Sequence, residues 1–282
     1  MSRLAEYAEL VKLPHTLFAL PFALAGALLG ANGAPAPAVV VWVLLAVLGA
    51  RTAAMAFNRL VDQRFDAANP RTADRALAAG RLGRAEAWAL VSGGSGLFLL
   101  AAASLNRWTL LLAPFALALA FGYSFTKRFT RFCHVVLGAA LAVAPFGGWL
   151  ATRGTPAGYP WALSLGVVAW VAGFDTLYAC LDVDFDRRAG LASLPAKLGP
   201  AAALQLARGF HLVAFLAFAA AGFATELAWP FWVGLGLSGV ALLVQHSLVR
   251  PQDLSRLQLA FFTCNAAIST TLLVAIFAAL KT

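Results

Sequence analysis

The sequence of 282 residues is strongly apolar and carries little charge. Its apolar fraction is 61%, its mean hydropathy is +0.80, and charged residues make up only 12%. An ordinary soluble domain has about 25% charged residues, so these values exclude one and indicate an integral membrane protein. The three cysteines stand far apart without a CxxC spacing, which argues against a disulfide framework or a zinc site.

Nine apolar segments are long enough to cross a membrane as helices. A hydrocarbon core of about 30 Å needs about 20 helical residues, and these segments lack the alternation of a barrel strand. A short amphipathic stretch over residues 2–13 precedes them. The predicted spans are 16–31, 38–58, 85–103, 108–125, 132–151, 161–181, 201–223, 229–249 and 257–280. We therefore expect an all-α membrane protein with nine transmembrane helices in a single domain over residues 1–282.

Basic residues are distributed unevenly between the two ends of these spans. Of 21 lysines and arginines, 18 fall on the side that holds the N-terminus, whereas Arg107, Arg153 and Lys281 fall on the other side. Short cytoplasmic loops carry such an excess, which predicts a protein of the inner (plasma) membrane with a cytoplasmic N-terminus and an outer C-terminus. The net charge of +9 fits this topology and a collar at the lipid headgroups, and it does not indicate nucleic-acid binding.

A first acidic motif, NRLVDQRFD, extends the second predicted span. At about 100° per residue, Asn58 and Asp62 lie near one face of this helix, and Asp66 lies just beside them. Arg51 shares the face about two turns inside the span, where a charged residue is costly and therefore functional by default. The alternative for Arg51 is a structural ion pair with Asp175.

A second acidic motif, DTLYACLDVDFD, follows the sixth predicted span. Asp175, Asp182 and Asp186 have the spacing of one helical stripe, with Asp184 facing away. The two DxxxD pairs are offset by 120 residues. This repetition predicts two like halves of four helices each, plus one further helix.

Six of the 12 acidic residues belong to these two motifs. Like charges at i and i+4 repel each other, so two such pairs around one cavity need cations between them. Oxygen ligands without histidine or cysteine partners favour Mg²⁺, and a nearby surplus of basic residues suggests a diphosphate as the ligand bridged by the metal. The basic residues expected to contact its phosphate oxygens are Arg71, Arg75, Lys127, Arg128, Arg187 and Lys197.

Together these motifs resemble the UbiA-type intramembrane prenyltransferase superfamily. NRLVDQRFD, NPRTADRALAAG, YSFTKRFT and a second DxxxD followed by GLASLPAKLG have the family's order and spacing over nearly the whole chain. The resemblance implies a nine-helix fold, an active site opening at the cytoplasmic side, and Mg²⁺-dependent transfer of a polyprenyl group from polyprenyl diphosphate to an aromatic ring in quinone biosynthesis. It implies metal-binding and catalytic roles for Asp62, Asp66, Asp182 and Asp186, with Asn58 as a further ligand. The implied substrate-binding residues are Arg51, Asn58, Arg71, Arg75, Tyr123, Lys127, Arg128, Asp175, Tyr178 and Lys197.

The identity of the aromatic acid is left open by departures from the family pattern. Members specific for 4-hydroxybenzoate usually have a Pro-Gln pair after the Lys-Arg segment, whereas this chain has Cys133 and His134. The segment DTLYAC resembles relatives that act on 1,4-dihydroxy-6-naphthoate in menaquinone synthesis. Either acid carries a carboxylate that Arg51 is placed to bind.

Two other classes of protein also carry intramembrane acidic residues. A secondary transporter would place them at broken helices near the bilayer midplane, whereas here they stand at predicted helix ends. A CDP-alcohol phosphotransferase would need one longer motif beginning Asp-Gly, which the sequence lacks.

Overall fold

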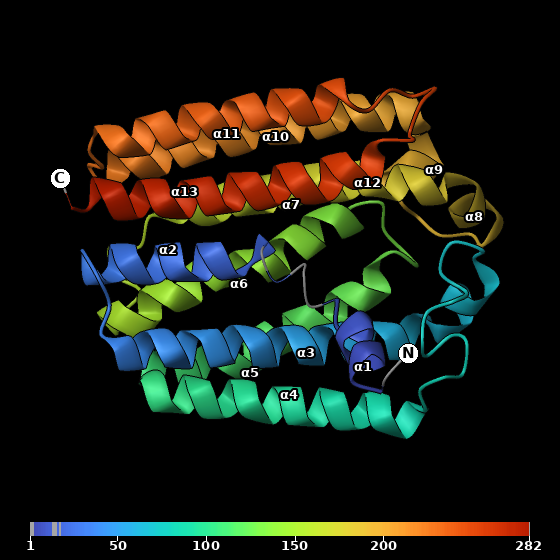
Figure 1. Ribbon diagram of the computed structural model, residues 1–282, viewed down its shortest axis with the longest axis horizontal. Coiled ribbons are helices and arrows are strands. Elements are labelled where there is room, and N and C mark those ends of the chain that lie inside the picture. Colours follow the sequence, from blue (N-terminus) through green and yellow to red (C-terminus); the bar gives the residue numbers. More distant parts are fainter. Residues whose placement is uncertain (1–2, 13–15, 17, 282) are drawn as a thin grey trace.

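The chain forms a bundle of helices that run along one common axis (Figure 1). The computed structural model describes residues 3–12, 16 and 18–281, and no β-strand occurs among them. The all-α prediction is therefore confirmed for this part of the chain. Residues 2 and 13 of the expected amphipathic stretch, and residue 17 of the first expected span, lie outside the described residues.

The helices follow the predicted segments closely in order and position. They are α1 (Arg3–Leu10), α2 (Leu20–Ala31), α3 (Pro37–Ala68), α4 (Arg84–Leu105), α5 (Arg107–Thr126), α6 (Cys133–Arg153), α7 (Trp161–Ala179), η2 (Cys180–Asp182), α8 (Val183–Arg188), α9 (Leu194–Leu198), α10 (Pro200–Ala224), α11 (Trp229–Ser247), α12 (Leu257–Leu259), η3 (Ala260–Cys264) and α13 (Asn265–Ala279).

Seven helical segments in the described part of the chain are long and apolar enough to cross a membrane. They contain α3, α4, α5, α6, α7 with α8, α10, and α12 with α13. Among the other predicted spans, α2 has only 12 described residues, and the last turn of α11 contains the polar residues Gln245, His246 and Ser247. The expected count of nine spans therefore stays a prediction.

Two helix ends differ from the predicted spans in a way that shapes the site. Helix α3 continues for 32 residues, about 48 Å at 1.5 Å per residue, so its last turns extend beyond a hydrocarbon core of about 30 Å and carry both motif aspartates. Helix α7, in contrast, ends at Ala179, and the 3₁₀ turn Cys180–Asp182 separates it from α8. The expected stripe of Asp175, Asp182 and Asp186 is therefore interrupted between Asp175 and Asp182, since a 3₁₀ turn changes the rotation per residue.

Glycine allows the central helices to approach closely. A Cβ atom at Gly148 of α6 would lie 1.9 Å from the carbonyl oxygen of Ala23 in α2, and one at Gly26 would lie 1.9 Å from that of Pro145. In a bilayer, apolar side chains pack as well against lipid as against another helix, so helix association depends on close backbone approach at small residues such as these. The α2–α6 contact links the α3–α5 group to the group of α7, α10, α11 and α13.

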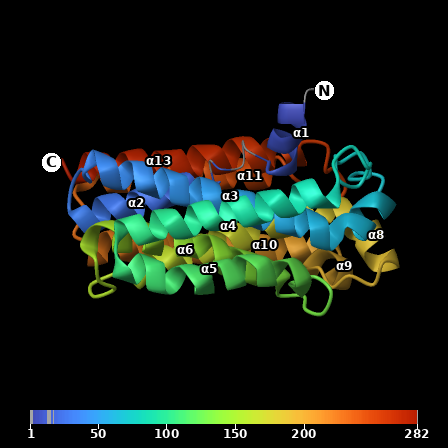
Figure 2. The same ribbon diagram turned by 90° about the horizontal axis from the view of Figure 1, so that it is seen from below.

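Both acidic motifs lie at the same end of the bundle. The ends of α3 and α7, together with α8, α9 and α1, gather at the right of Figure 1, and the C-terminus lies at the opposite end. Seen from below in Figure 2, α1 lies outside the bundle at this motif end. The two predicted four-helix halves would place α2 in the first half and α6 in the second. These two helices contact each other, so the division into halves stays a prediction.

Candidate functional site

The carboxylates of the first motif both contact cationic side chains. Asp62 Oδ1 lies 3.2 Å from a guanidinium nitrogen of Arg128, and the Asn58 amide donates to Asp62 Oδ2 at 3.0 Å. Asp66 is buried and lies between two guanidinium groups, with Arg75 at 2.6 Å and Arg59 at 3.4 Å. The predicted grouping of Asn58 and Asp62 on α3 is therefore observed, while Asp66 contacts a separate pair of arginines.

Asp182 of the second motif is bound by the loop that follows the first motif. Arg71 donates to both oxygens of Asp182, and the Asn69 amide donates to Oδ1 at 2.8 Å. The third guanidinium nitrogen of Arg71 donates to the Tyr178 hydroxyl at 3.1 Å. Burial alone lowers the pKa of Arg71, but the hydrogen bonds from Arg71 to Asp182 raise this pKa above its ordinary value. Arg71 is therefore a permanent cation in the site.

Asp186 is fully buried and is held by residues from two further segments. Lys127 Nζ lies 2.8 Å from Asp186 Oδ1, and the Ser193 hydroxyl donates to Oδ2 at 2.6 Å. Lys127 is followed by Arg128, which contacts Asp62 of the other motif. Adjacent residues of one loop thus bridge the two motifs.

Tyr123 lies in the last turn of α5. Four charged side chains of α3 and α7 interact electrostatically with its hydroxyl, namely Arg51, Arg59, Asp62 and Asp175. Arg51, Tyr123 and Asp175 are half-buried rather than closed off.

Arg51 has no carboxylate partner among the described residues. One of its terminal nitrogens donates to the backbone carbonyl of Lys12 at 3.3 Å, and its buried Nε has no hydrogen-bond partner in the part of the chain that the structure describes. The expected alternative, an ion pair with Asp175, is wrong, because Asp175 is bound to His134 instead. A half-buried guanidinium without a counter-ion among the described residues is suited to binding an anionic ligand.

Two of the predicted motif neighbours lie away from the carboxylates. Lys197 is exposed near the end of α9, and no ion pair joins it to a motif carboxylate within the described chain. Asp184 is exposed on α8, as its predicted orientation requires. The expected role of Lys197 in phosphate binding stays a prediction.

Sequence reasoning missed three residues that hold the motif aspartates. Arg59 lies seven residues before Asp66, close to the same helical face, so periodicity could have identified it. Asn69 and Ser193 lie in connecting segments, where helical periodicity carries no signal.

An open pocket of about 790 Å³ lies at the motif end, between the end of α3 and α8. Its lining includes Arg64, Arg128 and Arg188, together with Phe65 and Phe185. Arg128 also contacts Asp62, so this pocket adjoins the carboxylates. It gives an anionic ligand access to the motif end.

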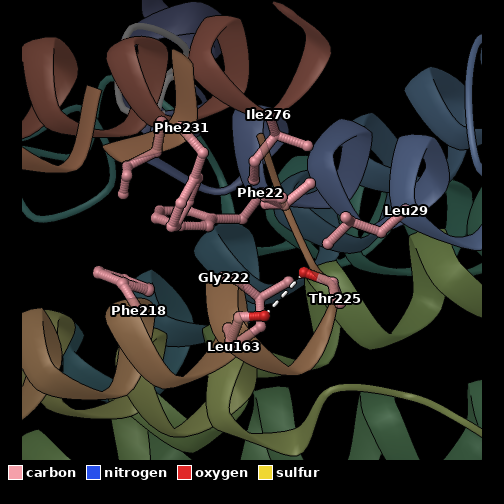
Figure 3. Close-up of a pocket in the computed structure, with 11 residues that line it drawn as sticks. Phe22, Leu29, Leu163, Phe218, Gly222, Thr225, Phe231 and Ile276 are labelled. Carbon is pink, nitrogen blue, oxygen red and sulfur yellow. Dashed lines mark hydrogen bonds between the residues drawn. The ribbon is translucent and has the colours of Figure 1, made fainter. Parts of the chain in front are cut away.

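A second cavity, shown in Figure 3, lies at the opposite end of the bundle. Phe22, Phe218, Phe231 and Ile276 surround it, and the Thr225 hydroxyl at its edge donates to the Ala221 carbonyl. Its volume of about 10 Å³ is that of a single water molecule, too little for a substrate.

The motif end has the donor chemistry for Mg²⁺, although it is not a closed metal cage. Within the described residues, no three side chains of His, Cys, Asp or Glu are grouped to hold one ion. Mg²⁺ is typically bound through one or two carboxylates, with phosphate oxygens and water completing its coordination. The carboxylate pairs therefore fit an ion that is shared with a phosphorylated ligand.

Comparison with known proteins gives consistent results at the levels of family, sequence and fold. The model of the UbiA prenyltransferase family matches residues 19–267. A 4-hydroxybenzoate octaprenyltransferase from Chromohalobacter salexigens is 34% identical over 229 residues, which cover 80% of this chain and 75% of that protein. One from Nitrosomonas europaea is 31% identical and covers 93% of this chain and 91% of its own length.

Solved structures include close structural neighbours. The apo structure of a UbiA homolog from Aeropyrum pernix has a TM-score of 0.86 and 38% identity, covering 94% of this chain and 97% of that chain. A UbiA homolog from Archaeoglobus fulgidus, bound to DMAPP and Mg²⁺, has a TM-score of 0.77 and 22% identity, covering 98% and 99%. At that identity the second likeness concerns the fold alone.

Proposed function

Because the chain belongs to the UbiA prenyltransferase family, we propose that it transfers a polyprenyl group from polyprenyl diphosphate to the ring of an aromatic acid. The reaction is Mg²⁺-dependent and serves quinone biosynthesis at the inner membrane, with the active site opening to the cytoplasm. The names of the bacterial relatives support 4-hydroxybenzoate as the type of acceptor.

The observation that carries this proposal is the pairing of all four motif carboxylates with basic side chains at one end of the bundle. Arg71, Arg75, Lys127 and Arg128 hold them in the described structure. A diphosphate that arrives with its metal offers each group a new partner, since carboxylates can bind the metal and basic side chains can bind phosphate oxygens.

Asp62, Asp66, Asp182 and Asp186 would hold the metal, with Asn58 as a further oxygen ligand. When bound, Mg²⁺ supplies charge stabilisation for the diphosphate leaving group. The basic side chains stabilise the same charge, so the bond from the allylic carbon to oxygen weakens. The bundle interior keeps water from the resulting cation.

The acceptor's carboxylate is assigned to Arg51. This guanidinium lies three turns before Asp62 on α3 and has no counter-ion among the described residues, so the carboxylate of an aromatic acid could pair with it and orient the ring toward the cation. A second candidate acceptor, 1,4-dihydroxy-6-naphthoate, is supported by the segment DTLYAC, which resembles relatives that act on this acid.

The test is prenyl transfer by purified protein in lipid nanodiscs. Product is expected with Mg²⁺, a polyprenyl diphosphate and one of the two acids, and EDTA is expected to abolish it until Mg²⁺ is restored in excess. Formation of no prenylated acid from either acceptor, by folded protein, would refute the proposal.

The same assay tests the metal-binding carboxylates. Asp62→Asn and Asp182→Asn each remove one negative charge from a motif, and we expect kcat to fall by at least about 100-fold. Asp184→Asn is the matched control, because this exposed residue lies in the second motif without a contact to the site. A loss of activity in the control equal to that of Asp182→Asn would contradict the assignment.

A further inference from the structure

The segment that joins α3 to α4, residues 69–83, carries two of the arginines that hold motif carboxylates. Arg71 pairs with Asp182, and Arg75 pairs with Asp66 at 2.6 Å. This arginine segment consists of turns and contains neither helix nor strand. Without a regular backbone ladder, its position depends on side-chain contacts with neighbouring elements.

Helix α1, which Figure 2 shows outside the bundle at the motif end, supplies many of these contacts. The two elements share a small apolar core that is separate from the main core of the bundle. Leu10 of α1 is only 2% exposed within it. Its other buried members include Leu60 of α3, Val91 of α4, and Ala76, Leu77 and Leu82 of the arginine segment.

Two carboxylates of α1 add polar contacts to the same segment. Glu6 Oε1 lies 3.4 Å from Arg81 Nε, and the Glu6 side chain is only 10% exposed. Glu9 Oε2 accepts a hydrogen bond at 3.4 Å from the backbone N–H of Ala76, the residue directly after Arg75. Glu6 and Glu9 are three residues apart and are therefore neighbours on one helical face.

Helix α1 is also tied to the point where the arginine segment ends and α4 begins. The Tyr7 hydroxyl donates to Glu86 Oε1 at 2.7 Å, and Arg3 donates to the backbone carbonyl of Arg81 at 3.0 Å. Glu86 in turn accepts from the backbone N–H of Gly83 at 2.7 Å. The segment is thus held by α1 both beside Arg75 and at its C-terminal end.

We propose that α1 positions the arginine segment for catalysis, with Glu6 and Glu9 as positioning residues that keep Arg71 and Arg75 ordered before the prenyl diphosphate arrives. This inference rests on the proposed function, in which both arginines bind phosphate oxygens. Among the described residues, no ion pair joins either glutamate to Arg71 or Arg75, so the glutamates act through the segment.

Order before binding matters because arginine has a long and flexible side chain. Each such side chain that a ligand must immobilise weakens affinity by about two- to tenfold. When α1 holds the segment, this ordering takes place during folding instead. Loss of the contacts from α1 should therefore weaken binding of the diphosphate, although α1 itself does not contact it.

The competing explanation is that α1 only stabilises the fold. Its apolar contacts would then raise the melting temperature, and its glutamates would have no effect on ligand affinity. The two explanations differ in whether donor affinity changes when the glutamates lose their charge, which is directly measurable.

The experiment measures donor binding in variants of the complete protein in nanodiscs. Glu6→Gln and Glu9→Gln, singly and together, remove the charges of α1 and keep the size of the side chains. Asp74→Asn is the matched control, because Asp74 contacts the same Arg81 at 2.8 Å from within the segment and its side chain is 99% exposed.

Four quantities are measured on each preparation. They are the Kd of farnesyl thiolodiphosphate with Mg²⁺, steady-state kcat with both KM values, the melting temperature, and amide hydrogen exchange of residues 69–83. The thiolodiphosphate is a donor analogue that ionises slowly, so its Kd reports binding without transfer.

A charge exchange tests the ion pair of Glu6 and Arg81 directly. Glu6→Arg places two guanidinium groups side by side, and adding Arg81→Glu restores a pair of opposite charges. Both changes are made in the Asp74→Asn background, so that the carboxylate introduced at position 81 does not face a second one. The combined variant should recover most of the donor affinity that Glu6→Arg loses.

We expect the double variant Glu6→Gln with Glu9→Gln to raise the Kd of the analogue and KM for the prenyl diphosphate by at least about fivefold. Amide exchange in residues 69–83 should become faster. KM for the aromatic acid should not change, because the backbone of Lys12 that contacts Arg51 is unaltered. Asp74→Asn should leave all of these values unchanged.

Several results would overturn the inference. A lower melting temperature with an unchanged Kd of the analogue would leave α1 as a support of the fold alone. Equal weakening of donor binding by Asp74→Asn, or no recovery in the charge exchange, would have the same meaning. If the double variant does not fold, the single variants and the charge exchange decide the question. If the analogue binds but no acid is prenylated, the proposed function fails, while the Kd values still test α1.

Discussion

At the scale of single residues, a substitution of Arg51 can distinguish a role in acceptor binding from a role in the fold. Its guanidinium donates to the Lys12 carbonyl, and its buried Nε has no hydrogen-bond partner within the described residues. Arg51→Lys keeps the charge but loses the planar fork that binds a carboxylate through two hydrogen bonds. We expect KM for the aromatic acid to rise at least about tenfold, with KM for the prenyl diphosphate unchanged.

The measurement combines both KM values with a melting temperature in detergent, on one preparation. A lowered melting temperature with unchanged acceptor kinetics would show that Arg51 serves the fold, through its contact with Lys12, and would leave the acceptor's anchor elsewhere.

The sequence predicted the motif aspartates because they share one helix and its period. Asn58 and Asp62 are four residues apart, so a 100° rotation per residue places them together without tertiary information. The contact between His134 and Asp175 joins residues 41 positions apart on two helices. No periodicity within one helix predicts such a pair, and the same is true of His211 and His246, whose ring nitrogens Nδ1 and Nε2 lie 2.8 Å apart.

At the scale of elements, the C-terminal ends of α3 and α7 show where sequence periodicity predicts the helix correctly and where it does not. The α3 helix continues through its motif, and its predicted face is largely retained. Helix α7 is followed by a 3₁₀ turn that begins at Cys180. After this turn, Asp182 contacts Arg71 and Asp186 contacts Lys127, whereas Asp175, before the turn, contacts His134. The predicted stripe assumed one uninterrupted helix, and neither glycine nor proline in the sequence signals the break.

The close crossing of α2 and α6 gives a prediction with a neighbouring control. Gly148→Ala would place a Cβ 1.9 Å from the Ala23 carbonyl oxygen, so the helices must separate. We expect a loss of about 1–3 kcal/mol in the free energy of unfolding. At Gly147, one residue away, an added Cβ meets nothing within 4 Å.

The check is thermal or denaturant unfolding of both variants in the same detergent. Gly147→Ala is expected to be neutral or slightly stabilising, because alanine has the better helix propensity. Equal destabilisation by the two substitutions would mean that helix flexibility, rather than the α2–α6 contact, determines the effect.

At the scale of the whole molecule, charge and chemistry are concentrated at one end. The four motif carboxylates, their basic partners and α1 lie at the motif end, while the C-terminus lies at the other (Figures 1 and 2). A polyprenyl diphosphate is a lipid with a charged head, so its apolar chain stays in the bilayer while its diphosphate reaches this end. The fold thereby brings a membrane-soluble donor and an aromatic acid to one boundary.

The uneven distribution of basic residues predicts that the motif end faces the cytoplasm. Single cysteines at two exposed positions test this in a chain whose three buried native cysteines are replaced by alanine: Asp184→Cys at the motif end and Lys281→Cys at the other end. In intact cells, a membrane-impermeant maleimide is expected to label Lys281→Cys alone, and permeabilised cells should be labelled at both positions. Each variant must retain prenyl transfer, which shows that it is folded. Labelling of Asp184→Cys in intact cells would reverse the orientation, and would then require the diphosphate and the aromatic acid to reach the site from outside the cytoplasm.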